Sequence, residues 1–140
     1  MMMIFLPQHA IQWSPPRDPS VVIELSERND LSIVGLLQSS KHAVYIYVRS
    51  LSDPLILGEI NRERERGVTV VVSLIESHGL PKGHPRTIIP GEMIIDASWK
   101  WYGPSNWNLA SYRASSDLIQ VGREEREFWS HYFRRMASFR

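Results

Sequence analysis

Cysteine is absent from the 140 residues of this chain. Its absence excludes disulfide bonds, thiolate nucleophiles and metal sites built on cysteine. Long apolar runs are also absent, since no stretch reaches the roughly 18 residues that a membrane-spanning helix requires. An excess of one charge is missing too, because 16 basic residues stand against 15 acidic ones and leave a net charge of +1. The chain as a whole is therefore not drawn to nucleic acid or membranes, although a local basic patch is compatible with this balance.

The composition is that of an ordinary soluble domain, with 43% apolar and 22% charged residues. The apolar segment Met1–Leu6 is too short for a signal peptide, and Pro7 interrupts it. We therefore expect a cytoplasmic protein in which residues 1–19 form an N-terminal arm and residues 20–140 form one domain.

The first half of the domain predicts strands and helices in alternation. The strand segments are rich in β-branched residues, and the helical segments repeat apolar residues every three or four positions. Asp53 followed by Pro54 is a helix start, and Gly67 is a helix end. A strand, a helix and a strand of these lengths imply parallel pairing with a right-handed crossover. Strands are predicted at Ser20–Leu25, Ala43–Val48 and Val68–Ile75, and helices at Ser26–Ser40 and from Asp53 to Gly67.

The second half predicts three short strands and a closing helix. The strands are expected at Glu92–Asp96, Lys100–Tyr102 and Asp117–Val121, and the helix at Arg123–Ser138. Together the two halves predict an α/β fold with a mixed, mainly parallel β-sheet and helices packed on both faces. The alternating charges of Asn61–Arg66 indicate a solvated helix face. Apolar stripes expected to face the core are Leu31, Ile33, Val34 and Leu37, then Leu55, Ile56 and Ile60, then Phe128, Trp129, Tyr132, Phe133 and Met136.

The segment Met93–Asn108 reads M-I-I-D-A-S-W-K-W-Y-G-P-S-N-W-N. It resembles the second half of the phospholipase D signature, in which His-x-Lys is followed by Asp, then by Gly-Ser and Asn. Six residues separate Asp96 from Gly103, as in that signature. The resemblance extends over roughly Ser20 to Phe139, and the size is similar to that of the short, single-motif nucleases of the superfamily, which build their site by homodimerisation. The residues that match the signature and the acidic residue of the next strand are Asp96, Gly103, Ser105, Asn106 and Asp117.

The reactive half of the signature is missing from its expected place. Counting back from Asp96 puts the motif histidine on Ile89 and the motif lysine on Gly91. The resemblance assigns attack on phosphorus to that histidine and stabilisation of phosphoryl charge to that lysine. Isoleucine cannot act as a nucleophile, and glycine supplies no cation. Pro104 likewise has neither a hydroxyl nor an N–H to donate. We therefore favour structural roles for the retained residues. Asp96 would cap or hold a turn, Gly103 would permit a positive φ or a close backbone approach, and Asn106 would fix a turn by bonding to backbone.

His84 and Arg86 form another His-x-basic pair, which lies five residues too early in the chain. If the segment after this pair bulged outward, His84 could serve as the nucleophile and Arg86 as a bidentate phosphate clamp. The other interpretation is that His84 is a solvent-exposed loop residue. No histidine has a metal-ligand partner at usable spacing, so we expect no metal site and no cofactor.

A tryptophan-rich strand and scattered basic residues offer a candidate binding surface. Strand alternation puts Trp99 and Trp101 on one face and Tyr102 on the other. The tryptophan face would either pack into the core or stack on a base, a protein partner or a second copy. The candidate binding residues are Lys82, Arg86, Trp99, Lys100, Trp101 and Arg113.

Three functional hypotheses follow. The leading one is a catalytically degenerate phospholipase D-like domain that acts as a binding or assembly module, on nucleic acid or beside a nucleic-acid enzyme. The second is an active, metal-independent nuclease or phosphodiesterase that uses His84 as its nucleophile. The third is a structural subunit that contacts proteins through the tryptophan-rich strand. The resemblance implies a homodimer, and no membrane partner is expected.

Overall fold

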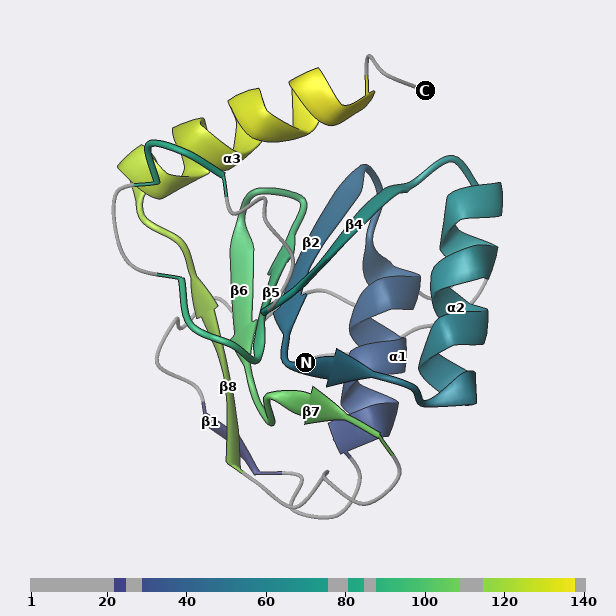
Figure 1. Ribbon diagram of the computed structural model, residues 1–140. Helices are drawn as coiled ribbons and strands as arrows, with labels where there is room; N and C mark the ends of the chain where they lie inside the picture. Colours follow the sequence, from purple (N-terminus) through teal and green to yellow (C-terminus); the bar gives the residue numbers. More distant parts are fainter. Residues whose placement is uncertain (1–21, 25–28, 76–80, 85–87, 109–114, 138–140) are drawn as a thin grey trace.

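A computed structural model of the chain describes residues 22–24, 29–75, 81–84, 88–108 and 115–137 (Figure 1). The predicted N-terminal arm, residues 1–19, lies outside the described residues. Within the described part, no helix is both long and apolar enough to cross a membrane. In chain order the elements are β1 (Val22–Glu24), α1 (Asn29–Ser39), β2 (Ala43–Val48), β3 (Ser50–Leu51), α2 (Pro54–Glu65), β4 (Thr69–Leu74), β5 (Glu92–Ile95), β6 (Trp99–Tyr102), β7 (Asn106–Trp107), β8 (Ser115–Gln120) and α3 (Arg123–Ala137).

Six strands form the main sheet in the order β1-β8-β6-β5-β2-β4, and β3 pairs with β7 in a small parallel sheet. The prediction of a mainly parallel main sheet is wrong. Among its described strands β2 and β4 run parallel, whereas the other four neighbouring pairs are antiparallel. Part of the reason is that Asp96–Ser98 joins β5 to β6 by a tight turn, a connection that serves antiparallel strands. The predicted pairing of the first two strands is also wrong, because β1 pairs with β8 at the far edge.

Helices cover both faces of the main sheet, as predicted (Figure 1). On one face, α1 and α2 enclose a core that includes Ile33, Ile56 and Trp101. On the other face, α3 encloses a second core that includes Tyr45 and Trp129. Because β2 lies between these two layers, all six of its residues are buried. The aromatic stripe of the closing helix therefore packs into the core, as its spacing predicted.

The start and the end of α2 follow from local chemistry. The Asp53 carboxylate accepts a hydrogen bond from the Leu55 N–H at 2.8 Å and so caps the helix. Gly67, with φ of 97°, follows the helix and adopts the left-handed conformation that ends many helices. Leu55 is 43% exposed, contrary to prediction, and so is Leu31, at 48%. Leu55 precedes buried Ile56 by about 100° around the helix axis, which takes it out of the buried stripe.

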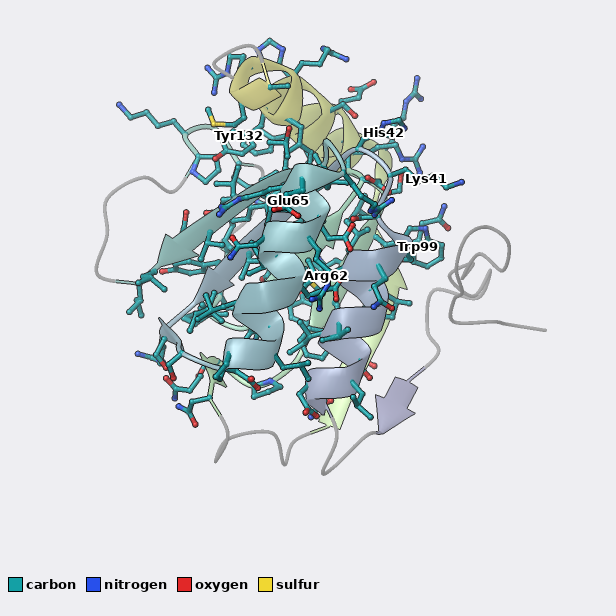
Figure 2. All side chains as sticks on the ribbon, turned by 90° about the vertical axis from the view of Figure 1, so that its right-hand side faces the viewer. Lys41, His42, Arg62, Glu65, Trp99 and Tyr132 are labelled. Carbon is teal, nitrogen blue, oxygen red and sulfur yellow. The ribbon has the colours of Figure 1, made fainter. Side chains whose placement is uncertain are left out.

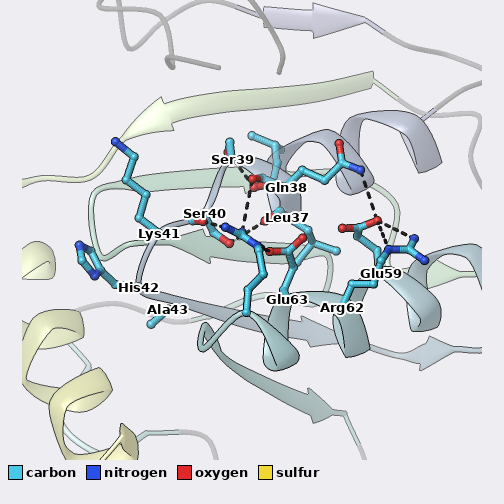
Figure 3. A network of polar contacts seen from close by, with 12 residues as sticks. Leu37, Gln38, Ser39, Ser40, Lys41, His42, Ala43, Glu59, Arg62 and Glu63 are labelled. Atoms are coloured by element: carbon cyan, nitrogen blue, oxygen red, sulfur yellow. Dashed lines mark hydrogen bonds and ion pairs between the residues drawn. The ribbon is translucent and has the colours of Figure 1, made fainter. Parts of the chain in front are cut away.

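The buried face of α2 includes two carboxyl groups, those of Glu59 and Glu63, which lie against α1 (Figure 3). Glu59 accepts hydrogen bonds from Arg62 at 2.7 Å and from Gln38 of α1 at 3.3 Å. Glu63 is paired with Arg66, which also donates to the carbonyl of Ser40 at the end of α1. The prediction of a solvated face is therefore wrong at Glu63, since these polar contacts join the two helices.

The two buried carboxyl groups differ in their proton affinity. Burial, followed by the hydrogen bond to Glu59, raises the pKa of Glu63 to about 7. Burial also opposes ionisation of Glu59, but hydrogen bonds from Glu63 and Arg62 hold the pKa of Glu59 below its usual range. When the two groups share a single proton, that proton therefore lies on Glu63 and the charge lies on Glu59.

Candidate functional site

The segment that resembles the phospholipase D signature folds as β5, a turn, β6 and β7. Asp96 and Ala97 in the turn have φ of 53° and 62°, values that L-residues seldom adopt. The carboxylate of Asp96 offsets this strain by accepting three backbone hydrogen bonds, from Lys41 at 3.0 Å, His42 at 2.7 Å and Ala43 at 3.0 Å. Asp96 thus fixes the start of β2, which agrees with its interpretation as a turn-holding residue.

The other end of β5 lies at the carboxyl end of β2, where Gly91 donates from its N–H to the Tyr47 carbonyl at 2.7 Å. Gly91 has φ of 102°, and its carbonyl accepts from the Gly103 N–H at 3.1 Å. A Cβ atom on Gly91 would lie 2.5 Å from the Gly103 carbonyl oxygen and 3.2 Å from that of Pro104. Backbone therefore occupies the space into which a side chain at position 91 would begin.

Gly103 is also required to be small, for a different reason. A Cβ atom there would lie 2.1 Å from the indole ring of Trp101, which is fully buried. Its φ lies outside the positive region. Of the two roles predicted for Gly103, the close approach is the one that the structure displays.

Ser105 and Asn106 meet the chain that leaves β2. The Ser105 carbonyl accepts from the Arg49 N–H at 2.7 Å. The Asn106 side-chain oxygen accepts from the Ser50 hydroxyl at 2.8 Å, a contact with a side chain rather than the predicted contact with backbone. Trp107 follows in the core, fully buried, with its indole N–H donating to the Pro104 carbonyl at 2.9 Å. We name this group of Arg49, Ser50, Gly91, Gly103, Ser105 and Asn106 the motif edge.

Ile89 stands beside the motif edge, and its side chain is 47% exposed. Its backbone N–H donates to the carboxylate of fully buried Glu92 at 3.0 Å. The segment before Gly91 is therefore fixed by a backbone contact to Glu92, and the side chain at position 89 presents hydrocarbon to solvent.

Comparison with known proteins supports this arrangement at the level of the fold. No family model matches the chain, and no curated protein matches it in sequence. NucT from Helicobacter pylori matches in structure with a TM-score of 0.56 and 17% sequence identity, over 84% of this chain and 93% of NucT. The chain has the phospholipase D-like fold. At this level of identity the likeness concerns the fold alone.

Within this phospholipase D-like fold, His84 lies away from the motif edge, against α3. Its side chain is 4% exposed, and its Nε2 atom lies 3.3 Å from the carboxylate of Glu125. The imidazole also makes edge contacts with the rings of Phe128 at 4.9 Å and Trp129 at 5.2 Å. The interpretation of His84 as a solvent-exposed loop residue is therefore wrong, because the first turns of α3 enclose it.

Lys100 belongs to the same buried group. Its ammonium lies 3.6 Å from Glu125, and the indole N–H of Trp129 donates to that carboxylate at 3.2 Å. One carboxylate thus contacts two basic side chains and an indole under α3. Burial raises the pKa of neighbouring Tyr45 to about 12, so this phenol stays neutral.

The remaining candidate residues do not form one surface in the described part of the chain. Trp101 is fully buried and Trp99 packs against the same core, as the core interpretation of this strand expects. Lys82 is exposed. Asp117 pairs with Tyr102 and so lies at the Gly103 end of the sheet. Arg86 and Arg113 lie outside the described residues, and among the described ones no three acidic or histidine side chains gather as a metal site.

Sequence reasoning did not single out Arg49, Ser50 or Glu125 as site residues. Arg49 and Ser50 follow a predicted strand and carry the polar groups nearest its carboxyl end, which is a usable signal. Glu125 lies in the predicted first turn of the closing helix, where acidic residues are common, so nothing in its position marked it as the partner of His84.

Proposed function

We propose that this chain is a catalytically degenerate phospholipase D-like domain that binds nucleic acid without cleaving it. One observation carries the proposal: at Gly91, the position of the motif lysine, a Cβ would lie 2.5 Å from a backbone oxygen. At Ile89, the position of the motif histidine, an exposed hydrocarbon side chain offers no nucleophile. The chemistry that the resemblance implies requires a nucleophile and a cation at these two positions.

His84, the alternative nucleophile, is poorly placed for catalysis. The imidazole of His84 contacts Glu125 at 3.3 Å and two aromatic rings of α3, so it is engaged in packing on that face. An attacking histidine must reach a phosphorus atom in an accessible cleft, and a side chain that is 4% exposed is poorly placed for that.

The motif edge is the binding surface that we propose. Arg49 is exposed there, and its backbone is fixed to Ser105. Its guanidinium could pair with a phosphate, and the Ser50–Asn106 pair supplies further polar groups beside it. Backbone phosphate contacts of this kind bind nucleic acid without reading its sequence.

We further propose a homodimer through the same end of the sheet. Leu74 and Ile89 are exposed by 41% and 47%, and both flank the carboxyl end of β2: Leu74 pairs with Val48, and Ile89 lies two residues before Gly91. A second copy that covers these apolar side chains would remove them from water and place two motif edges together.

Binding is tested by titrating labelled single- and double-stranded DNA and RNA at increasing salt. The wild type should bind at low salt and lose affinity as salt rises. Arg49→Gln should weaken binding to all sequences and reduce the salt slope by about one counterion. Arg126→Gln, an exposed arginine of α3, is the matched control and should leave both values unchanged. Absence of binding at low salt would contradict the proposal and favour the protein-contacting subunit.

The dimer is tested by sedimentation. Ile89→Lys should shift the chain toward the monomer, because it places a charge in the apolar contact. Gln120→Lys is the control, since it adds the same charge at the opposite end of the sheet, where Gln120 pairs with Trp99. A wild-type monomer at all concentrations, or equal effects of the two variants, would refute the dimer.

A further inference from the structure

A pocket of about 420 Å³ lies at the end of the sheet opposite the motif edge. It is formed by the starts of β2 and β4, the turn between β5 and β6, and the second half of α3. Its volume falls in the range of small-ligand sites, about 300–1,000 Å³. The lining residues are Lys41, His42, Ala43, Gly67, Thr69, Asp96, Ala97, Ser130, Phe133, Arg134 and Ala137.

Three exposed basic side chains line this pocket: Lys41, His42 and Arg134. We call it the cationic pocket. Figure 2 shows Lys41 and His42 close together at the edge of the molecule, beside α3. In Figure 3 both point away from the polar network that joins α1 to α2, so that network does not use them. The side chains of Lys41 and His42 are therefore available to a ligand.

Asp96 is the one carboxylate among the described residues of the lining, and its oxygens are already hydrogen-bonded. Its two oxygens accept three backbone hydrogen bonds from residues 41 to 43. Those contacts stabilise the carboxylate without using the side chain of Lys41 or Arg134. The one negative charge of Asp96 thus stands against the positive charges of Lys41 and Arg134, so the described lining has an excess of positive charge, although the chain as a whole carries a net charge of only +1.

The floor of the cationic pocket is apolar and largely made of small groups. Ala43 and Ala97 are buried, and Phe133, which is 7% exposed, also lines the cavity. Small side chains leave room for a flat group, and an aromatic ring contacts such a group favourably. The lining therefore suits a ligand that has an anionic end and a flat apolar body.

We propose that the cationic pocket binds a phosphate ester of mononucleotide size. The phosphate would lie between Lys41 and Arg134, where the guanidinium can donate two parallel hydrogen bonds to it. The base would lie over Ala97 beside Phe133. This site is separate from the motif edge, so it does not depend on nucleic-acid binding there.

The test is isothermal titration of the full chain with 5′-AMP at low salt. We expect a dissociation constant below about 1 mM, with at least tenfold weaker binding of adenosine, which lacks the phosphate, and of inorganic phosphate, which lacks the base. Arg134→Gln and Lys41→Gln should each weaken AMP binding at least fivefold. Arg126→Gln, on the same helix but outside the lining, should bind AMP as the wild type does.

A further variant tests whether AMP needs the volume of the cationic pocket rather than its charges. Ala137→Phe fills the pocket from an exposed helix position and should abolish AMP binding with the circular dichroism spectrum unchanged. The proposal is overturned if the wild type produces no binding heat with AMP. It is also overturned if Arg134→Gln and Ala137→Phe both bind AMP as tightly as the wild type, because the ligand would then occupy another place. Oligonucleotide binding that depends on Arg49 is measured separately, so the two proposals can fail independently.

Discussion

Gly91→Ala should destabilise the protein far more than a glycine substitution at a position with similar backbone geometry. The added Cβ would meet the Gly103 carbonyl oxygen at 2.5 Å, and that oxygen belongs to backbone that pairs with Gly91 itself. A φ of 102° adds strain for any residue with a side chain, about 1–2 kcal/mol. The overpacking adds about 1–3 kcal/mol, so we expect a total loss of roughly 2–5 kcal/mol.

Gly67→Ala measures the strain of a positive φ without the collision of an added Cβ atom. Gly67 has φ of 97°, close to that of Gly91, but an added Cβ there would meet nothing within 4 Å. It should cost only the strain, about 1–2 kcal/mol. The entropy that alanine removes from the unfolded chain is similar for both variants and cancels in the comparison. Gly122→Ala, with neither a positive φ nor a near neighbour, is the neutral control.

Urea denaturation of the three variants measures these differences, and thermal unfolding checks them at roughly 4 °C per kcal/mol for a chain of this size. Equal losses of stability for Gly91→Ala and Gly67→Ala would contradict the predicted collision, because position 91 would then have room for a side chain. The proposed function would then lose its main support, which is the lack of space for a side chain at position 91.

Three further predictions concern the groups that hold the fold together. Gly103→Ala should cost about 1–3 kcal/mol in urea denaturation, because its Cβ meets the buried Trp101 ring; a loss within error of zero would contradict this packing. Asp96→Ala should lower the free energy of unfolding by about 1–3 kcal/mol, because it removes the acceptor of three backbone N–H groups. Asp96→Asn should lower it by less, and a larger loss for Asp96→Asn than for Asp96→Ala would contradict this role. The raised pKa of Glu63, about 7 against an ordinary 4.5, contributes stability that is present below pH 4.5 and lost as pH rises through 7. Glu63→Gln should therefore reduce the loss of unfolding free energy between pH 5 and pH 7. If the variant lost as much unfolding free energy over this range as the wild type, the raised pKa of Glu63 would be contradicted.

Much of the element order followed from local sequence. The β2 strand was predicted with its observed bounds, Ala43–Val48, because β-branched and aromatic residues run without interruption from Val44 to Val48. The start of α2 was predicted from Asp53 and Pro54, whose capping chemistry is local. The closing helix was predicted within one residue of its observed range. In each case the signal is carried by residues that are neighbours in the chain.

Pairing between distant segments was less predictable. The order of the strands depends on which faces the helices cover, so β1 came to pair with β8 rather than with its nearest strand in sequence. The burial of Glu63 depends on Arg66 and on the end of α1, and alternating charges alone predicted exposure. His84 was expected in solvent because its loop is rich in proline and glycine, whereas contacts with α3 enclose it.

At the candidate site, the sequence predicted the identity of the retained residues better than their arrangement. Asp96 and Gly103 have structural contacts of the kind expected from a turn residue and a close approach. Their separation to opposite ends of β5 and β6 could not be read from spacing, because it requires knowing that Asp96 contacts the start of β2. The cationic pocket likewise joins Lys41 to Arg134, which lie on elements far apart in the chain.

A cleavage assay tests whether the motif edge lacks the groups for phosphoryl transfer. Purified chain is incubated with single- and double-stranded DNA and RNA in EDTA, beside His84→Ala. We expect intact substrates with both proteins, at concentrations where the wild type binds them. Robust cleavage by the wild type that His84→Ala abolishes would contradict it and establish the second hypothesis in its place.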